Sequence, residues 1–563
     1  MRPLSPERVI AVRPLVTRLT RRLLAFGGAL TVAATLVVAQ APQASAADST
    51  TYLNGATVGG DVAAGAGKVF VAANDRIIVA NAGGELTGAI TGLSGVVGLA
   101  MTPDGTRLYS ALSGSMQVAE IDTADLSIIR RIDLAGFPCP SNLALSGDRL
   151  WVGYGCRFTW GGGILGLDLT ATAPQPIAVG NNTSSAPLVA AAGDTLLAGD
   201  PDIMPADLMV YDVSATPATL RGVIAGLPSL GDLAATPDGS MAITVVGGGK
   251  QYDVWDTTSL TKARSYGADP AMGATRAVAV SPDGVHLAGG RSGDPRLTLY
   301  DTATGTRTYT NDDPVGELVP GSLTFSGTDV YGVLKERNSN GRLHLWRLHG
   351  ATLPASTLTL TPPPTPATVL QPLSMTGRLT LSDESAPGAQ SLMVIRRVPY
   401  RADETLPGVT TAADGTFTVT DTPPFAGDIS YDVVWDGGPD ARWSRASVTV
   451  PVEFIQSSLT LSGPGEGIAG QELQFSGTFE IGDQPAPPGS WLWVDRIVHI
   501  PGGTAAITLP GVTTASDGSF SFTDTPADAG QYTYIVRADE SVVSSATEAR
   551  HNVTVTNGDS PLL

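Results

Sequence analysis

Histidines, cysteines and clustered carboxylates supply most catalytic and metal-binding side chains, and this sequence holds few of them in useful arrangements. Five histidines and two cysteines occur among 563 residues. The chain lacks the motifs of a nucleophile elbow, a phosphate-binding loop, a helical zinc site and a haem attachment site. We therefore expect no catalytic residue, no metal site and no cofactor.

Two short acidic runs offer oxygen ligands for calcium. Ca²⁺ takes about six to eight oxygens in a defined shell, and neither run has the spacing of an EF-hand loop. A solvated acidic loop is the interpretation that we favour for both. The runs consist of Asp200, Asp202 and Asp207, and of Asp312, Asp313 and Glu317.

The two cysteines, Cys139 and Cys156, flank a segment with the pattern of a β-hairpin. The turn residues Ser146-Gly147-Asp148 lie midway, so the cysteines would face each other across adjacent strands. In secreted proteins such a pair forms a disulfide. Closing a loop of this size stabilises the fold by about 3 kcal/mol in the chain-entropy model. A redox role is disfavoured because the spacing is not C-x-x-C.

Four aromatic residues lie close to the second cysteine, namely Trp151, Tyr154, Phe158 and Trp160. A loop fixed by a disulfide and rich in aromatics can form a platform for a sugar ring or a peptide. Trp151 and Tyr154 could equally pack inside the fold. These four residues are the candidate binding residues.

The elements that must position these residues repeat along the chain. A turn followed by an alternating strand occurs seven times between residues 50 and 350, at steps of about 36 to 46 residues. A second strand end, such as "TLYD" at Asp301, recurs in step with the first at about 45 residues. A unit of that length holds four strands, the size of a propeller blade. The copies begin near Gly65, Thr102, Leu145, Ala191, Thr236, Ser281 and Phe325.

The seventh copy lacks an outer strand after Arg347, whereas the segment from Thr51 to Val58 precedes the first copy. We predict that this segment pairs with the last sheet and closes the ring, because closure removes open sheet edges.

The repeats resemble the YVTN and WD40-like seven-bladed propellers of bacterial exported proteins. The matching features are the "SPDG" turn at Ser281 and the "WDT" and "YDT" strand ends at Trp255 and Tyr300. The resemblance implies a propeller over residues 47–351. It implies little about activity, because propellers host both enzymes and binding proteins.

The C-terminal part of the chain carries one string twice. "LPGVTTAADGTFTVTDTP" starts at Leu406 and "LPGVTTASDGSFSFTDTP" starts at Leu509, and 14 of the 18 positions are identical. Each string belongs to a unit of about seven short strands in about 100 residues, which fits an immunoglobulin-like sandwich. The units span 352–453 and 454–556, and a tail follows at 557–563.

Each string has the pattern of two strands joined by a turn. We expect Asp414-Gly415 and Asp517-Gly518 to be hairpin turns, and Phe417 and its counterpart to point into the core. The Thr and Ser positions then form an exposed polar face. The units resemble the Ig-like repeats of exported actinobacterial proteins through the segment "TTAADGTFTVTDTP", which implies a stalk or adhesive spacer.

The first 46 residues have the pattern of a signal peptide. Six arginines and one glutamate accompany an apolar run from Leu23 to Val38, and "ASA" at Ala44 to Ala46 is a small-residue cleavage site. Such a run spans about 24 Å as a helix, short of a hydrocarbon core of about 30 Å, which favours a removed signal over an anchor. Both the general secretory route and the twin-arginine route fit the pattern.

These features together predict an all-β protein, a seven-bladed β-propeller followed by two immunoglobulin-like β-sandwich domains. The net charge is −19, and about −24 without the signal peptide, so no nucleic-acid partner is expected. We expect a secreted or cell-surface protein without a membrane span in the mature chain, whose propeller binds an extracellular protein or polysaccharide. The alternative is a propeller enzyme, a lactonase-like hydrolase or a lyase, which needs converging ionisable side chains at the channel.

Overall fold

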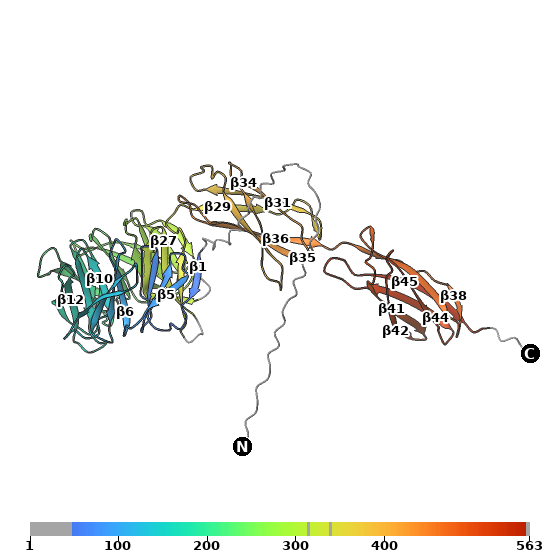
Figure 1. Ribbon diagram of the computed structural model, residues 1–563, viewed down its shortest axis with the longest axis horizontal. Helices are drawn as coiled ribbons and strands as arrows, with labels where there is room; N and C mark the ends of the chain where they lie inside the picture. Colours follow the sequence, from blue (N-terminus) through green and yellow to red (C-terminus); the bar gives the residue numbers. More distant parts are fainter. Residues whose placement is uncertain (1–47, 312–315, 337–340, 559–563) are drawn as a thin grey trace, which may run out of the picture. The chain divides into compact units, whose positions relative to one another are not determined.

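The computed structural model describes residues 48–311, 316–336 and 341–558, and every regular element in these ranges is a β-strand (Figure 1). The all-β prediction is therefore confirmed for the described part of the chain. No helix long and apolar enough to cross a membrane occurs there. The predicted signal peptide, Asp312, Asp313 and the last five residues of the predicted tail lie outside the described residues.

Residues 49–348 form seven four-stranded antiparallel sheets. Six sheets are built from four consecutive strands, and the seventh combines the last three strands with the first strand of the chain. The sheets are β2 (Val62–Gly65), β3 (Lys68–Ala72), β4 (Ile77–Asn81) and β5 (Leu86–Ile90); β6 (Val96–Met101), β7 (Arg107–Leu112), β8 (Gln117–Asp122) and β9 (Ile128–Asp133); β10 (Asn142–Ser146), β11 (Arg149–Tyr154), β12 (Gly162–Asp168) and β13 (Ile177–Thr183); β14 (Leu188–Ala192), β15 (Thr195–Gly199), β16 (Ala206–Asp212) and β17 (Thr219–Leu227); β18 (Asp232–Ala235), β19 (Met241–Val245), β20 (Tyr252–Asp256) and β21 (Lys262–Tyr266); β22 (Thr275–Val280), β23 (His286–Arg291), β24 (Leu297–Asp301) and β25 (Arg307–Asn311); and β26 (Gly316–Ser326), β27 (Asp329–Glu336), β28 (Leu343–Leu348) and β1 (Ser49–Tyr52).

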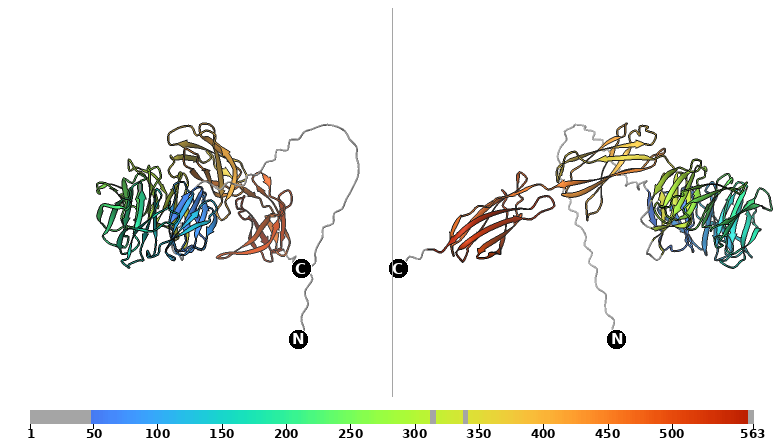
Figure 2. Two further views of the ribbon diagram at one scale, coloured as in Figure 1. Left: turned by 60° about the vertical axis from the view of Figure 1, so that its left-hand side comes forward. Right: turned by 180° about the vertical axis from the view of Figure 1, so that it is seen from behind.

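The first strands of these sheets contact one another in sequence, and β26 contacts β2, so the sheets form a closed ring. The first sheet, in blue, thus lies next to the seventh, in yellow-green (Figure 2). Four-stranded antiparallel sheets repeated around a centre are a β-propeller. The first strand of each sheet, from β2 to β26, is called its inner strand below. Each copy of the turn-and-strand motif in the sequence therefore corresponds to one four-stranded sheet.

Strand β1 closes the ring, as predicted. It pairs antiparallel with β28, with Thr50 opposite Trp346. The strand covers Ser49–Tyr52 and not Thr51–Val58, because the chain turns inward after it: Leu53 is fully buried and donates its N–H to the carbonyl of Leu343 at 2.9 Å. Closure thus joins the start of the described chain to its seventh sheet.

The Pro-Asp-Gly turns are built as their residue types indicate. At the second sheet, one oxygen of Asp104 accepts the hydroxyl of Thr102 at 2.6 Å and the N–H of Thr106 at 3.0 Å, and Gly105 adopts a φ of 70°. A glycine is needed there because a side chain is unfavourable at positive φ. Each such turn joins an inner strand to the next strand of its sheet.

The C-terminal part forms two successive pairs of sheets. In each pair a smaller sheet and a five-stranded sheet are formed from equivalent segments of the duplicated sequence. The first pair consists of β29 (Ser356–Thr361), β31 (Leu373–Leu381) and β34 (Thr416–Asp421), and of β30 (Ala367–Thr368), β36 (Ser444–Glu453), β35 (Gly427–Trp435), β32 (Ser391–Arg397) and β33 (Glu404–Thr410). The second pair consists of β37 (Ser457–Leu459), β39 (Leu473–Ile481), β40 (Gln484–Pro485) and β43 (Ser519–Asp524), and of β38 (Glu466–Ile468), β45 (Thr547–Thr556), β44 (Gly530–Ala538), β41 (Trp491–Ile500) and β42 (Gly503–Thr513).

The two sheets of the first pair share one apolar core, whereas those of the second pair meet in two apolar clusters. In the first pair, Met375 and Val419 of the smaller sheet cluster with Leu392, Tyr431 and Val450 of the five-stranded sheet. Each of these strands is apolar on the face that meets the other sheet and polar on the other face, as expected for packed sheets.

The hairpin prediction for Asp414-Gly415 and Asp517-Gly518 is wrong. Strand β33 pairs with β32, whereas β34 pairs with β31, so the first turn carries the chain from one sheet to the other. The second copy does the same between β42 and β43. The local turn chemistry is as expected, since Asp414 accepts the N–H of Thr416 at 3.1 Å. Phe417 is buried as predicted.

Candidate binding surface

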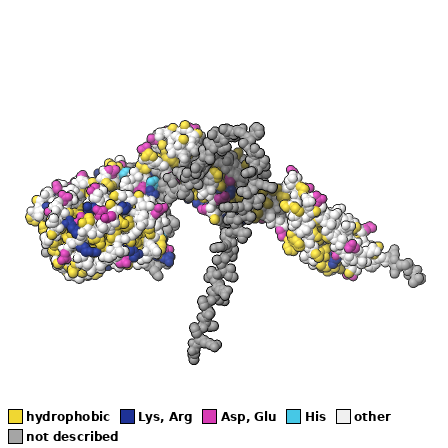
Figure 3. Space-filling model, viewed as in Figure 1, with side chains coloured by type: hydrophobic (Ala, Val, Ile, Leu, Met, Phe, Trp, Pro, Cys, Tyr) yellow, Lys and Arg dark blue, Asp and Glu magenta, His cyan; other side chains and the backbone are white. Residues whose placement is uncertain are grey.

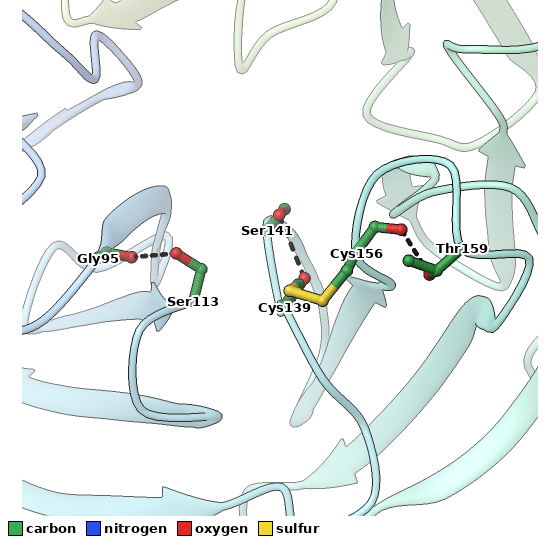
Figure 4. Close-up of a disulfide and its surroundings, with 6 residues drawn as sticks. All are labelled: Gly95, Ser113, Cys139, Ser141, Cys156 and Thr159. Carbon is green, nitrogen blue, oxygen red and sulfur yellow. Dashed lines mark hydrogen bonds between the residues drawn. A yellow bond between two sulfur atoms is a disulfide. The ribbon is translucent and has the colours of Figure 1, made fainter.

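A short loop, Gly155–Gly161, connects β11 to β12 and is anchored by a disulfide. The sulfurs of Cys139 and Cys156 are bonded, with 5.1 Å between the two Cα atoms, which confirms the predicted pairing (Figure 4). Cys139 precedes β10 and Cys156 follows β11, so the bond joins the two open ends of this hairpin. The hydroxyl of Thr159 donates to the carbonyl of Cys156 at 2.7 Å and fixes the loop further.

Two of the predicted binding residues lie at the surface of this loop. Phe158 and Trp160 are each 63% exposed. Their φ angles are 61° and 54°, in the left-handed region that costs non-glycine residues about 1 kcal/mol. The backbone at these two residues is strained, and the surrounding contacts hold it in that conformation. As a result, two large aromatic side chains are exposed to solvent.

An ion pair ties the loop to the next sheet. The guanidinium of Arg157 lies 4.8 Å from the centre of the Phe158 ring and donates to Asp202 in the loop between β15 and β16, with Nη2 2.7 Å from Oδ1. The Arg157 guanidinium lowers the pKa of the Asp202 carboxyl. Met204 in the same loop is 75% exposed. The exposed side chains of Phe158, Trp160 and Met204 are called the loop surface below.

The other two predicted binding residues are buried, which corrects half of the prediction. Trp151 is 2% exposed and its indole packs on Gly166, where a Cβ would lie 2.6 Å from the ring. Tyr154 is 6% exposed and meets the ring of Phe137 edge-on at 4.8 Å. Both side chains belong to β11, which is covered by neighbouring sheets on both faces, so neither of its alternating faces reaches solvent. Met204 was missed because its surroundings carry no distinctive pattern.

In the acidic run beside Met204, Asp207 is exposed as expected, whereas Asp200 is buried and Asp202 is half-buried. Asp200 is buried and accepts the N–H of Ser184 at 2.6 Å and the hydroxyl of Ser185 at 3.0 Å. Asp202 pairs with Arg157, and Asp207 accepts the N–H of Gly226 at 3.0 Å. The three carboxylates therefore serve three separate contacts. Within the described ranges no group of three His, Cys, Asp or Glu side chains is placed to hold a metal ion.

Two buried carboxylates, Asp61 and Asp232, lie at the start of inner strands. Asp61 accepts the N–H of Val62 at 2.8 Å and that of Leu99, on the next inner strand, at 2.7 Å. Asp232 accepts the N–H of Val278, also on the next inner strand, at 2.8 Å. Burial raises the pKa of each carboxyl to about 7, and the charge of Asp61 adds to the rise at Asp232. Each side chain therefore clamps two neighbouring sheets.

The polar face of the duplicated string borders a groove in each C-terminal sheet pair. The groove is about 690 Å³ in the first pair and about 560 Å³ in the second. Hydroxyl groups line both, and one position differs in charge, with Arg378 in the first pair and Thr478 in the second. The equivalent hydroxyl residues include Thr359, Thr376 and Thr416 in the first groove, and Thr460, Ser476 and Ser519 in the second.

Comparison with known proteins found matches among solved structures alone. No family model matches the chain, and no curated protein matches it. Among solved structures, the Cps50 (Swd1) β-propeller domain of Myceliophteria thermophila is 14% identical, with a TM-score of 0.41, and the match covers 53% of this chain and 99% of that one. Hydrazine synthase of Kuenenia stuttgartiensis is 17% identical, with a TM-score of 0.39, and the match covers 52% of this chain and 98% of that one.

Proposed function

We propose that the chain is an exported, non-catalytic binding protein. Its first part is a seven-bladed propeller over residues 47–351 that contacts an extracellular protein or polysaccharide through the loop surface. Two immunoglobulin-like domains, 352–453 and 454–556, act as spacer or adhesive modules. The proposal includes removal of the first 46 residues during export and activity at or beyond the cell surface.

One observation carries this proposal, the rigid exposure of Phe158 and Trp160. Neither side chain contributes to a core in this position, and each would bury a large apolar area against a partner, worth about 2 kcal/mol or more. The disulfide and the Arg157–Asp202 ion pair hold the loop. A partner therefore binds without the entropy cost of ordering the loop, which is the usual advantage of a preorganised aromatic anchor.

The enzymatic alternative rests on Asp61 and Asp232, whose raised pKa values suit proton transfer. Both carboxylates are engaged by backbone N–H groups of adjacent strands, and in the described residues no third His, Cys, Asp or Glu joins them in a metal-binding cluster. These hydrogen bonds explain both carboxylates as structural links between neighbouring sheets. The binding function therefore has the stronger support.

The experiment compares capture of partners by the mature protein and by a Phe158→Ala/Trp160→Ala variant. Immobilised protein is exposed to culture medium and to cell-surface extract of the source organism. Tyr400→Ala is the matched control, since Tyr400 is a fully exposed aromatic at a φ of 61° far from the loop in sequence. We expect capture by the wild type and the control and none by the double variant. Equal capture by all three contradicts the proposal.

A further inference from the structure

A second aromatic surface lies on the second C-terminal sheet pair. Trp491 and Trp493 of β41 are 52% and 44% exposed, and their rings meet edge-on with centroids 5.9 Å apart. Alternate residues of a strand share one face, so both indoles stand on the outer face of the five-stranded sheet. Figure 3 shows hydrophobic side chains gathered over β41 and β42.

Both indoles are held in place by the sheet itself. Trp491 lies against Gly511 of β42, where a Cβ would come within 2.2 Å of the indole ring. The glycine lets one side of the ring rest on the backbone while about half of the residue stays exposed. The Trp493 Nε1–H donates to Asp539 Oδ2 at 2.8 Å. The rings are therefore oriented before any ligand arrives.

The fold does not require these tryptophans. In the first sheet pair the equivalent residues are Ser391 and Met393: Ser391 lies opposite Thr410 as Trp491 lies opposite Thr513, and Met393 lies opposite Val434 as Trp493 lies opposite Arg537. The two sheets have the same strand order. Two half-exposed tryptophans in one copy alone point to a role other than folding.

Polar groups flank the indoles closely. Arg537 lies opposite Trp493 and its guanidinium pairs with Asp495, while Asp539 holds the indole N–H. A membrane-facing surface would instead carry an excess of Lys and Arg on its polar side. A protein hot spot would usually be a closed apolar pocket. A flat apolar ring edged by a carboxylate and a guanidinium complements a pyranose, which has an apolar C–H face edged by hydroxyl groups.

We propose that Trp491 and Trp493 form a binding site for a neutral polysaccharide. The face of one indole stacks on a pyranose ring, the other indole, at 83° to the first, borders that ring, and Arg537 and Asp539 hydrogen-bond the sugar hydroxyl groups. The site is independent of the loop surface and of the partner that binds there. It assigns a ligand-binding role to the second of the two duplicated units and none of this kind to the first.

The test uses the mature full-length chain and the substitutions Trp491→Ser/Trp493→Met, which install the residues of the first copy and so preserve folding. Retention by hydroxyethyl cellulose, a soluble β-glucan and a soluble chitin derivative is measured by affinity electrophoresis. We expect at least one polysaccharide to retard the wild type and the variant to bind about tenfold more weakly or not at all. Phe158→Ala/Trp160→Ala should bind as the wild type does, which separates this site from the proposed function of the propeller.

Three results would overturn the proposal. One is that none of the neutral polysaccharides retards the wild type. Another is that the Trp491→Ser/Trp493→Met variant is retarded equally. The third is that the two tryptophans are required for binding anionic vesicles of phosphatidylglycerol and not for binding sugars.

Discussion

Arg396 and Asp421 join the two sheets of the first C-terminal pair. Nη1 of Arg396, on β32, lies 2.8 Å from both carboxylate oxygens of Asp421, on β34, and the phenol of Tyr431 donates to the same carboxylate at 2.7 Å. The second pair repeats the arrangement with Arg496 and Asp524 at 2.7 Å. The aspartate that ends each duplicated string is therefore an inter-sheet contact, which accounts for its presence in both copies.

Replacing Asp421 by Asn should destabilise the first sheet pair by about 3 kcal/mol or more. Arg396 is only 7% exposed, and the one other carboxylate that it contacts, Glu404 at 2.6 Å, is 61% exposed. Removing Asp421 therefore takes away the better-buried of its two partners and leaves its charge poorly compensated. Denaturant unfolding of the mature chain measures the change. Asp414→Asn, an exposed turn residue of the same string, is the control and should cost below about 1 kcal/mol. Equal effects of the two substitutions would contradict the inter-sheet role.

Removing residues 47–58 should lower the melting temperature of the propeller by many degrees. The deletion takes away β1, exposes the edge of β28 and removes the buried Leu53 and Ala56. Differential scanning calorimetry of the mature chain with and without the segment measures the effect. An unchanged melting temperature would show that the ring does not depend on this closure.

Replacing both cysteines by serine should reduce the free energy of unfolding by about 3 kcal/mol, because the unfolded chain regains the freedom of a 17-residue separation. The same variant should lose partner binding through the loop surface, since the strained loop is no longer held at Cys156. Unfolding curves and partner capture are both recorded. Full capture by this variant would mean that the disulfide does not order the loop.

The stability of the propeller should fall as pH rises from about 4 to about 7. The folded-state pKa values of Asp61 and Asp232 are about 7, above the ordinary value for Asp of about 3.9. In this window the folded protein keeps protons that the unfolded chain releases. Each carboxyl group therefore lowers the free energy of unfolding by up to about 1.4 kcal/mol for each unit by which the pH rises. Above pH 7 the contribution levels off.

The Asp61→Asn/Asp232→Asn variant isolates this effect from that of all other carboxylates, since it cannot ionise at these two positions. The free energy of unfolding is measured for both proteins at several pH values between 4 and 8. We expect the wild type to lose stability relative to the variant as pH rises. Parallel profiles would contradict the raised pKa values.

Local features of this chain could be predicted from its sequence, and long-range ones could not. The turn at Asp104, the Cys139–Cys156 bond and the closing strand follow from turn chemistry and spacing. The sequence does not predict that Phe158 is exposed and Trp151 is buried. Because β11 is covered on both faces, its alternation of residue types does not indicate which side chains reach solvent. The hairpin prediction at Asp414 is wrong because a turn within one sheet and a turn between two sheets use the same residue types.

The functional surfaces show the same division. The loop around Cys156 was recognisable from its aromatic residues, whereas the contribution of Met204 depends on an ion pair that spans two sheets. The outward position of Trp491 and Trp493 could have been found from the sequence by comparing them with Ser391 and Met393 in the other copy. The clamp between Asp61 and Leu99 joins residues 38 positions apart and has no local signal.

The central claim, that the loop surface of the propeller binds an extracellular partner, is tested most directly by an affinity measurement. The captured partner is titrated against the wild type, Phe158→Ala/Trp160→Ala and Tyr400→Ala, and the melting temperature of each protein is recorded. We predict that the double variant binds about tenfold more weakly or worse with an unchanged melting temperature, and that Tyr400→Ala binds as the wild type does. A dissociation constant for the double variant equal to that of the wild type would contradict the claim.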